Sequence, residues 1–280
     1  MLTYLQAILL GFLQGVTELF PISSLGHSVL VPALLGWHID QASDQFLAFV
    51  VATHFATALV LFGFFFREWI AIITGIARSF FKRKMAAADI PTLVGWRIVV
   101  SSIPAGLLGL LLKKKVEGLF ASPVLVAVFL VANGIVLYVA ERIRRKALEG
   151  KADDAKIAAL SWRAAFGIGC AQAFALIPGF SRTGVAMTGS LLSGLSHENA
   201  ARYAFLLATP LISAAALLEA PRLFANGGAE LPIAFVGALA AALASYLSVR
   251  FLTRYFETKT LEPFAGYCFV AGLVALAVLL

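Results

Sequence analysis

Residues 18–27 read ELFPISSLGH, and residues 178–184 read PGFSRTG. Each polar segment interrupts an apolar stretch long enough to cross a membrane, the first covering residues 2–37 and the second residues 164–195. Irregular backbone at membrane depth must be buried in protein or line a water-filled cavity. A helix–turn–helix that enters and leaves on the same side meets this requirement. We therefore interpret both regions as re-entrant hairpins, and the alternative is two pairs of short spans with surface loops.

The composition places the chain in a membrane. Of its 280 residues, 61% are hydrophobic and 13% are charged, and the mean hydropathy is +0.92. Soluble domains carry roughly 45–50% apolar and about 25% charged residues, which excludes a soluble enzyme. The net charge of +7 does not indicate a nucleic-acid partner, because a basic surface needs polar area to lie on. Cys170 and Cys268 lie within apolar stretches, so we expect small core residues and neither a disulfide nor a metal pair.

Six further stretches are apolar enough for membrane spans. A spanning helix needs about 20 predominantly apolar residues. The predicted fold is therefore an all-α polytopic membrane protein, with six transmembrane helices plus two re-entrant helix hairpins, in one integral membrane domain covering residues 1–280. The predicted spans are residues 45–66, 98–112, 118–140, 203–218, 231–249 and 263–280, of which 98–112 and 203–218 are short.

The two hairpin regions resemble each other in sequence. If each half, approximately residues 1–141 and 160–280, holds one hairpin and three spans, the odd number turns the second copy upside down. The sequence thus predicts an inverted-topology repeat, a plan whose sites lie near the bilayer midplane. Residues that match at an offset of 158 include Gly11 with Gly169, Gln14 with Gln172, Ser23 with Ser181, and Gly26 with Gly184.

The basic residues predict the orientation. Loops at residues 67–97, 142–163 and 250–259 hold sixteen of the 22 Lys and Arg residues. Cytoplasmic loops carry such an excess, so both termini are predicted to lie outside, and the first hairpin opens outward. The outer loops hold only Lys113, Lys114, Lys115 and Arg222, and the triple lysine is the one departure from this rule.

Two charged residues stand out because they fall inside the broken regions. A charge at bilayer depth is costly and by default marks a function; these are Glu18 and Arg182. The alternative is a buried ion pair that merely holds the two hairpins together. Gln14 shares a helix face with Glu18, since the two are four residues apart.

The polar neighbours favour chemistry on a phosphate. After the helix stop at Pro21, the first turn presents Ser23, Ser24 and His27, and a hydroxyl, an imidazole and a carboxylate are the parts of an activated nucleophile. The second segment is a donor-rich loop that opens a helix, which suits a phosphate. Its residues of interest are Gly179, Ser181, Arg182, Thr183 and Gly184.

These motifs carry a family resemblance. Residues 14–27, QGVTELFPISSLGH, resemble the first signature of the bacterial undecaprenyl-diphosphate phosphatases, also called bacitracin-resistance proteins, and residues 178–182, PGFSR, resemble the second. The resemblance covers essentially the whole chain. It implies hydrolysis of undecaprenyl diphosphate to undecaprenyl phosphate and inorganic phosphate at the outer face of the bacterial inner membrane. This reaction recycles the lipid carrier of peptidoglycan synthesis and confers bacitracin resistance.

The resemblance also implies roles for the residues. A divalent cation, Mg²⁺ or Ca²⁺, is expected, with Glu18 as a weak ligand because Mg²⁺ keeps waters and uses substrate phosphates. The nucleophile is Ser24, His27 or a water, and Ser24 is favoured. The expected catalytic residues are Glu18, Ser24, His27 and Arg182, and the expected phosphate-binding residues are Gln14, Ser23, Gly26, Gly179, Ser181, Thr183 and Gly184.

The sequence departs from the family pattern at two positions, and two rival functions are considered. Leu25 and Ala186 stand where the family commonly has Thr, which removes two hydroxyls that could contact phosphate. The acid-phosphatase-like lipid phosphatases expect a His six residues after the Arg, but this position is Thr188. A transporter of polyprenyl phosphate or small anions could use the same midplane groups only to bind. The expected partners are the polyprenyl diphosphate substrate and the lipid bilayer, and a homodimer is left open.

Overall fold

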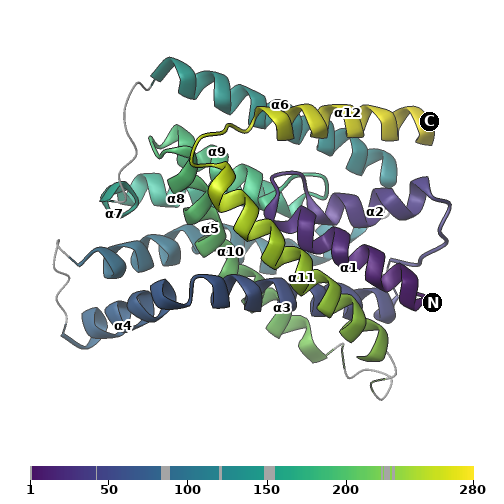
Figure 1. The fold of residues 1–280 in the computed structure, drawn as a ribbon, viewed down its shortest axis with the longest axis horizontal. Helices are drawn as coiled ribbons and strands as arrows, with labels where there is room; N and C mark the ends of the chain where they lie inside the picture. The colour runs from purple at the N-terminus through teal and green to yellow at the C-terminus, as the bar shows by residue number, and fades with distance from the viewer. Residues whose placement is uncertain are drawn as a thin grey trace.

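The computed structural model describes residues 2–41, 43–82, 89–119, 122–147, 155–221, 223, 228 and 231–280. Within these residues the chain is helical and has no strand, which confirms the all-α prediction (Figure 1). Six helices are long and apolar enough to cross a membrane, as predicted. They are α3 (Asp44–Phe64), α5 (Ile90–Leu119), α6 (Pro123–Ala147), α10 (His197–Glu219), α11 (Leu231–Tyr255) and α12 (Glu262–Leu279).

The predicted bounds of several spans differ from those of the helices, and α10, expected at residues 203–218, begins at His197. The span placed at residues 118–140 begins too early, because residues 118 and 119 end α5 and Pro123 opens α6, a position that proline favours. The span placed at residues 98–112 is too short, because α5 begins at Ile90. Arg97 lies inside the helix with its guanidinium stacked 3.6 Å from the centre of the Trp162 ring. Such a contact lets a charged side chain lie within an apolar helix.

The basic segments predicted as loops are partly helical. Residues 67–97 contain α4 (Phe66–Lys82), which follows α3 after the single residue Phe65. Trp69 and Ile72 are buried, and a Cβ on Gly95 of α5 would lie 2.8 Å from Cγ2 of Ile72. The apolar face of α4 thus packs closely on α5. Residues 142–163 likewise hold the end of α6, the short helix α7 (Ala155–Ala159) and the first residues of α8 (Trp162–Ala173).

Each broken region forms two short helices joined by a turn. The first comprises α1 (Tyr4–Leu19) and α2 (Ser24–Leu34), and the second comprises α8 (Trp162–Ala173), the 3₁₀ turn η1 (Phe174–Leu176) and α9 (Arg182–Leu192). With 16, 11, 12 and 11 residues, the four α-helices are shorter than a span of about 20 residues. The two helices of each region pack side by side. This geometry is consistent with re-entrant hairpins.

The tips of the two hairpins touch each other and are held by one side chain. Asn133 of α6 donates from Nδ2 to the Pro21 carbonyl at 3.1 Å and accepts at Oδ1 from the Ser181 amide at 3.1 Å. A Cβ on Gly26 would lie 3.3 Å from the Cα of Gly179, so little space separates the tips. Asn133 therefore ties the two tips to each other.

The matching serines of the two hairpins are helix caps. Ser23 Oγ accepts from the Gly26 amide at 3.1 Å, and Ser181 Oγ accepts from the Gly184 amide at 3.1 Å. A serine cap that bonds the amide three residues on stabilises a helix start by about 1 kcal/mol. The repeated spacing thus has a local structural cause. Ser23 also adopts a φ of 72°, which is uncommon outside glycine.

The helices of the two halves pack in corresponding pairs. Helix α1 lies against α11, and α8 lies against α5; α3 contacts α10, and α6 contacts α12. Glycines allow the close approaches: a Cβ on Gly11 would overlap the Gly237 carbonyl, and a Cβ on Gly169 would lie 2.5 Å from the Ser101 carbonyl oxygen. Both chain ends lie on one side in Figure 1, and the far ends of α4 and α6 reach the other side.

The cysteine expectation is half right. Cys268 is buried on α12, where its sulfur lies 3.3 Å from Nδ2 of Asn133. Cys170 is exposed on α8 and is not a core residue. Both thiols are free in the structure.

Candidate active site

The carboxylate of Glu18 is the centre of a buried polar cluster. Its Oε1 accepts a hydrogen bond from Arg182 Nη2 at 2.7 Å, and its Oε2 accepts one from the hydroxyl of Ser24. The Nε2 atom of His54 lies 3.2 Å from the same Oε2. Glu18 is 5% exposed. Donors from α9, α2 and α3 therefore converge on one carboxylate near the end of α1.

Local structure explains how the groups meet. Glu18 lies in the last turn of α1, and Arg182 is the first residue of α9, directly after its cap Ser181. Thr183 donates to the backbone carbonyl of Glu18 at 2.9 Å, which ties the two helix ends together. The expected juxtaposition of Glu18 and Arg182 is present. The Thr183 hydroxyl, expected at a phosphate, here serves this link.

A small cleft opens beside the carboxylate. Its free volume of about 20 Å³ holds roughly one water. A diphosphate is far larger, so the hairpin tips or the side chains around them must move to admit one. The Arg182 side chain, 23% exposed, is the accessible cation of the Glu18 pair. The cleft is lined by Thr17, Glu18, Ser24, Leu25, Ala175, Phe180, Ser181 and Arg182.

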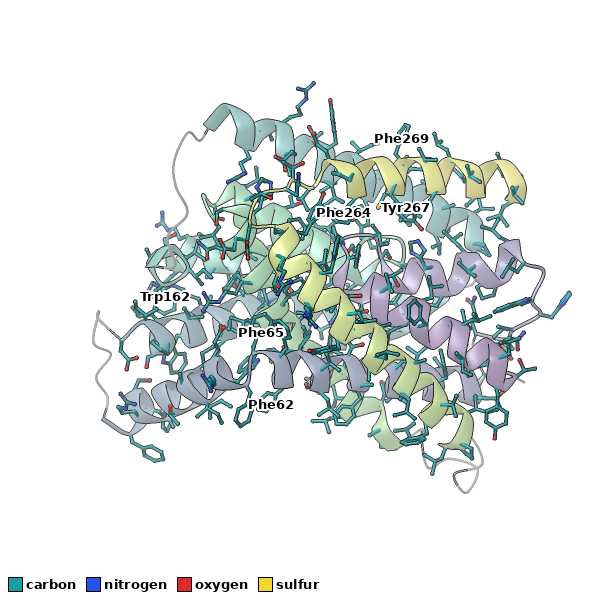
Figure 2. The ribbon with its side chains drawn as sticks, viewed as in Figure 1. Phe62, Phe65, Trp162, Phe264, Tyr267 and Phe269 are labelled. Carbon is teal, nitrogen blue, oxygen red and sulfur yellow. The ribbon has the colours of Figure 1, made fainter. Side chains whose placement is uncertain are left out.

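His27 lies outside this cluster. Its Nδ1 is 2.6 Å from the Ser23 carbonyl oxygen and its Nε2 is 2.8 Å from the Tyr267 hydroxyl. A carbonyl only accepts, so Nδ1 carries the proton and Nε2 accepts from Tyr267. Figure 2 shows Tyr267 on the side of α12 that faces α1 and α2. Among the described hydrogen bonds, none joins His27 to Ser24, Glu18 or Arg182.

Gln14 is turned towards α3 and α11. Its Oε1 lies 3.2 Å from the Thr57 hydroxyl, which is 2.8 Å from the hydroxyl of Ser245. The Nε2 atom of Gln14 is buried and makes no hydrogen bond to a described residue. Gln14 is an expected phosphate-binding residue, and its side-chain N–H groups are available to donate a hydrogen bond.

Two residues that contact the expected catalytic side chains were missed by the sequence analysis. His54 offered a signal, since an ionisable side chain in the middle of a predicted span by default marks a function. Tyr267 offered none, because one aromatic residue in an apolar helix is ordinary packing. The contact between His27 and Tyr267 joins residues 240 positions apart.

The described residues do not fit a metal held by the protein alone. They contain no group of three His, Cys, Asp or Glu side chains that could bind a metal ion. Glu18, the expected weak ligand, already receives Arg182, Ser24 and His54 on its two oxygens. With three donors at its two oxygens, two of them from basic side chains, the carboxylate has few free lone pairs with which to bind a cation.

Fold and site together define a class. The chain is a multi-pass membrane protein in which a carboxylate, a hydroxyl and a guanidinium meet where two helix hairpins touch. It matches the family described as "Bacitracin resistance protein BacA" over residues 7–274, and it belongs to that family. This confirms the resemblance that the two motifs indicated.

Curated relatives cover nearly the whole chain. A protein of Mycolicibacterium paratuberculosis named undecaprenyl-diphosphatase is 44% identical over 97% of this chain and 95% of its own length. One of Burkholderia thailandensis, undecaprenyl-diphosphatase 2, is 46% identical over 96% of this chain and 94% of its own. A third, the undecaprenyl-diphosphatase of Acidiphilium cryptum, is 45% identical over 98% of both chains.

Proposed function

We propose that this protein is an undecaprenyl-diphosphate phosphatase, which hydrolyses the lipid diphosphate to undecaprenyl phosphate and inorganic phosphate. One observation carries the proposal: the Ser24 hydroxyl donates to Glu18, whose other oxygen pairs with Arg182, beside a cleft. A nucleophile, its base and a phosphate-binding cation are thus assembled in one place. The names of the relatives support the choice of substrate.

The geometry favours Ser24 as the nucleophile. Ser24 Oγ attacks the terminal phosphorus while Glu18 takes the hydroxyl proton, and the bond from phosphorus to the bridging oxygen breaks as undecaprenyl phosphate leaves. Glu18 passes this proton to the departing phosphate, which restores the carboxylate. Water then attacks the phosphoserine, Glu18 takes the proton of that water and returns it to Ser24 Oγ as the bond from phosphorus to Oγ breaks, and inorganic phosphate leaves. Arg182 neutralises charge on the transferring group, because phosphoryl transfer depends mainly on positioning and electrostatics.

His27 is less suited to attack. Its Nε2 lone pair, which would form the bond to phosphorus, accepts a hydrogen bond from Tyr267. Ser24 instead lines the cleft together with its base. Direct attack by a water that Ser24 orients remains the competing scheme, and trapping of a phosphoenzyme separates the two.

A divalent cation, Mg²⁺ or Ca²⁺, is proposed to arrive with the substrate. Mg²⁺ is commonly held by substrate phosphates and waters with one or two carboxylates, which agrees with the poor fit of the described residues to a metal site. When bound, the cation supplies charge neutralisation at the diphosphate. The protein's own contribution is the guanidinium of Arg182.

The helix pairs support two inverted halves, approximately residues 1–141 and 160–280. Equating α1 with α8 and α11 with α5 maps each observed pair onto the other. The mapping puts Leu176, Arg182 and Val185 at the positions of Glu18, Ser24 and His27. One hairpin thus supplies the nucleophile and base, and the other supplies the phosphate clamp.

The orientation proposed from the basic residues places both termini and the mouth of the first hairpin outside the bacterial inner membrane. The site then works on the outer face, where it recycles the carrier for peptidoglycan synthesis. Consumption of the diphosphate that bacitracin sequesters would account for resistance. Leu25, Ala175 and Phe180 give the cleft an apolar side on which the first isoprene units can lie.

The rival function is transport of the lipid phosphate, which the inverted halves favour. The test is inorganic phosphate release from undecaprenyl diphosphate by pure protein in detergent, where no transport can occur. We expect multiple turnovers. Substrate binding without phosphate release would overturn the phosphatase proposal and favour the transporter.

A further inference from the structure

The carboxylate of Glu18 has a third partner whose position suggests a specific task. We infer that His54 of α3 is a positioning residue, which holds the Glu18 carboxylate in the orientation that accepts the Ser24 proton. The inference rests on the proposed function, because it concerns the same phosphoryl transfer. His54 need not touch the substrate, since it acts through Glu18.

The imidazole of His54 is itself held in one orientation. Its Nδ1 lies 2.8 Å from the Val50 carbonyl oxygen, so Nδ1 is the donor of that bond. This bond fixes the ring plane and leaves Nε2 facing Glu18 Oε2 at 3.2 Å. Because Nδ1 already donates to Val50, Nε2 donates to Glu18 in the imidazolium form, in which both ring nitrogens carry protons. The ring is 13% exposed, which keeps water from competing freely for the contact.

Glu18 needs such a partner. The terminal torsion of a glutamate side chain is broad, so the helix does not set the plane of the carboxylate. Arg182 holds Oε1, and His54 holds Oε2 from a second direction. With both oxygens held, a remaining lone pair of Oε2 is directed at the Ser24 hydroxyl.

Two side chains of α3 contact two polar side chains of α1. Thr57, nearly one turn beyond His54, contacts Gln14, which lies one turn before Glu18. The hydroxyl of Thr57 also contacts the hydroxyl of Ser245, which links this part of α3 to α11. Because His54 and Thr57 of α3 both contact side chains of α1, the position of α3 along α1 places His54 beside Glu18.

Two isosteric substitutions separate the nitrogens of His54. The amide nitrogen of Gln reaches approximately where Nε2 lies, so His54→Gln keeps a donor to Glu18. The amide nitrogen of Asn reaches approximately where Nδ1 lies, so His54→Asn keeps only the bond to Val50. We expect the Gln variant to retain most of kcat. The Asn variant should lose about 10-fold or more in kcat, a part of what a positioned base contributes.

KM separates this role from a structural one. Both variants should keep KM within about 3-fold, because Arg182 still binds the phosphate and a purely transition-state loss falls on kcat. His54 would be no positioning residue if the Asn and Gln variants had equal kcat, or if only KM changed. His38→Asn, on an exposed histidine, is the matched control and should behave as wild type.

Melting of each variant in detergent shows whether it is folded. A folded Asn variant with normal kcat overturns the inference, and the phosphatase proposal then survives. Absence of phosphate release by the wild-type protein overturns the proposed function, and this inference with it. If the Asn variant unfolds, the Gln variant decides alone: a folded Gln variant with low kcat contradicts the donor role.

Discussion

Arg182 contacts Glu18 through one edge of a planar guanidinium, at a site that is open to the cleft. Lysine keeps the charge but presents a compact ammonium in place of the planar fork. We expect Arg182→Lys to insert and fold but to lose kcat on the order of 100-fold, as when a preorganised charge-stabilising donor is removed. Phosphate release from purified protein measures this. Turnover near the wild-type rate would make Arg182 only a counter-ion of Glu18.

Glu18→Gln tests the base. The amide keeps the shape of the side chain but cannot accept the Ser24 proton, and Gln14 offers no replacement charge. The expected loss in kcat is about 100-fold to 10,000-fold, the range of general-base contributions. Glu257→Gln, at an exposed carboxylate, is the control and should leave turnover unchanged. An active Glu18→Gln variant would remove the carboxylate from the mechanism.

At the residue scale, the sequence predicted which charged residues belong to the site but not which residues contact its other side chains. Glu18 and Arg182 were predictable partners, because two rare charges at membrane depth stabilise each other. The partner of His27 was not predictable, since it depends on how α12 packs against the first hairpin. Ser23, Ser181 and Thr183 show a different difficulty: a hydroxyl at a helix start can cap the helix or bind a phosphate, and the same motif serves both.

At the scale of elements, glycine spacing sets how close two helices lie. A Cβ at Gly169 of α8 would come within 2.5 Å of the Ser101 carbonyl oxygen, whereas one at Gly167 would meet nothing within 4 Å. Gly169→Ala should therefore destabilise the fold by about 1–3 kcal/mol, the usual cost of overpacking. Gly167→Ala on the same helix should be neutral or stabilising, because Ala favours helix. Thermal melting in detergent compares them, and equal melting temperatures would contradict the predicted close packing of α8 on α5.

Element existence was easier to predict than element ends. Apolar length identified six spans, because a bilayer imposes the length. Helix α4 was missed because its basic residues resemble those of a cytoplasmic loop, although Trp69, Ile72 and Ile76 repeat at helical spacing. The start of α6 was misplaced because apolar content alone does not mark the boundary between two consecutive helices.

For the whole molecule, the central expectation is the orientation of the protein in the membrane. Both chain ends lie on one side of the structure (Figure 1). An alkaline phosphatase fused after Leu280 should be active, because this reporter folds only outside the cytoplasm. A green fluorescent protein fused after Ala147, at the end of α6, should fluoresce. An inactive alkaline phosphatase fusion together with a non-fluorescent green fluorescent protein fusion would show the opposite orientation, with the site on the cytoplasmic face.

The sequence does not indicate what ties the two hairpins together. Matching Gln, Ser and Gly residues indicated two related hairpins. Asn133, which bonds both hairpin tips, lies in an apolar span and matches neither motif. A contact of this kind depends on the assembled helices, so no local pattern could have indicated it.

The account depends most directly on Ser24 as the atom that attacks phosphorus. The measurement is to quench turnover of undecaprenyl diphosphate labelled in its terminal phosphate, under acid and under alkali in parallel, and to map the labelled residue. We predict label on Ser24 that survives acid, and no label in Ser24→Ala. Acid-labile label on His27, or no label together with inversion at phosphorus, would contradict a Ser24 nucleophile.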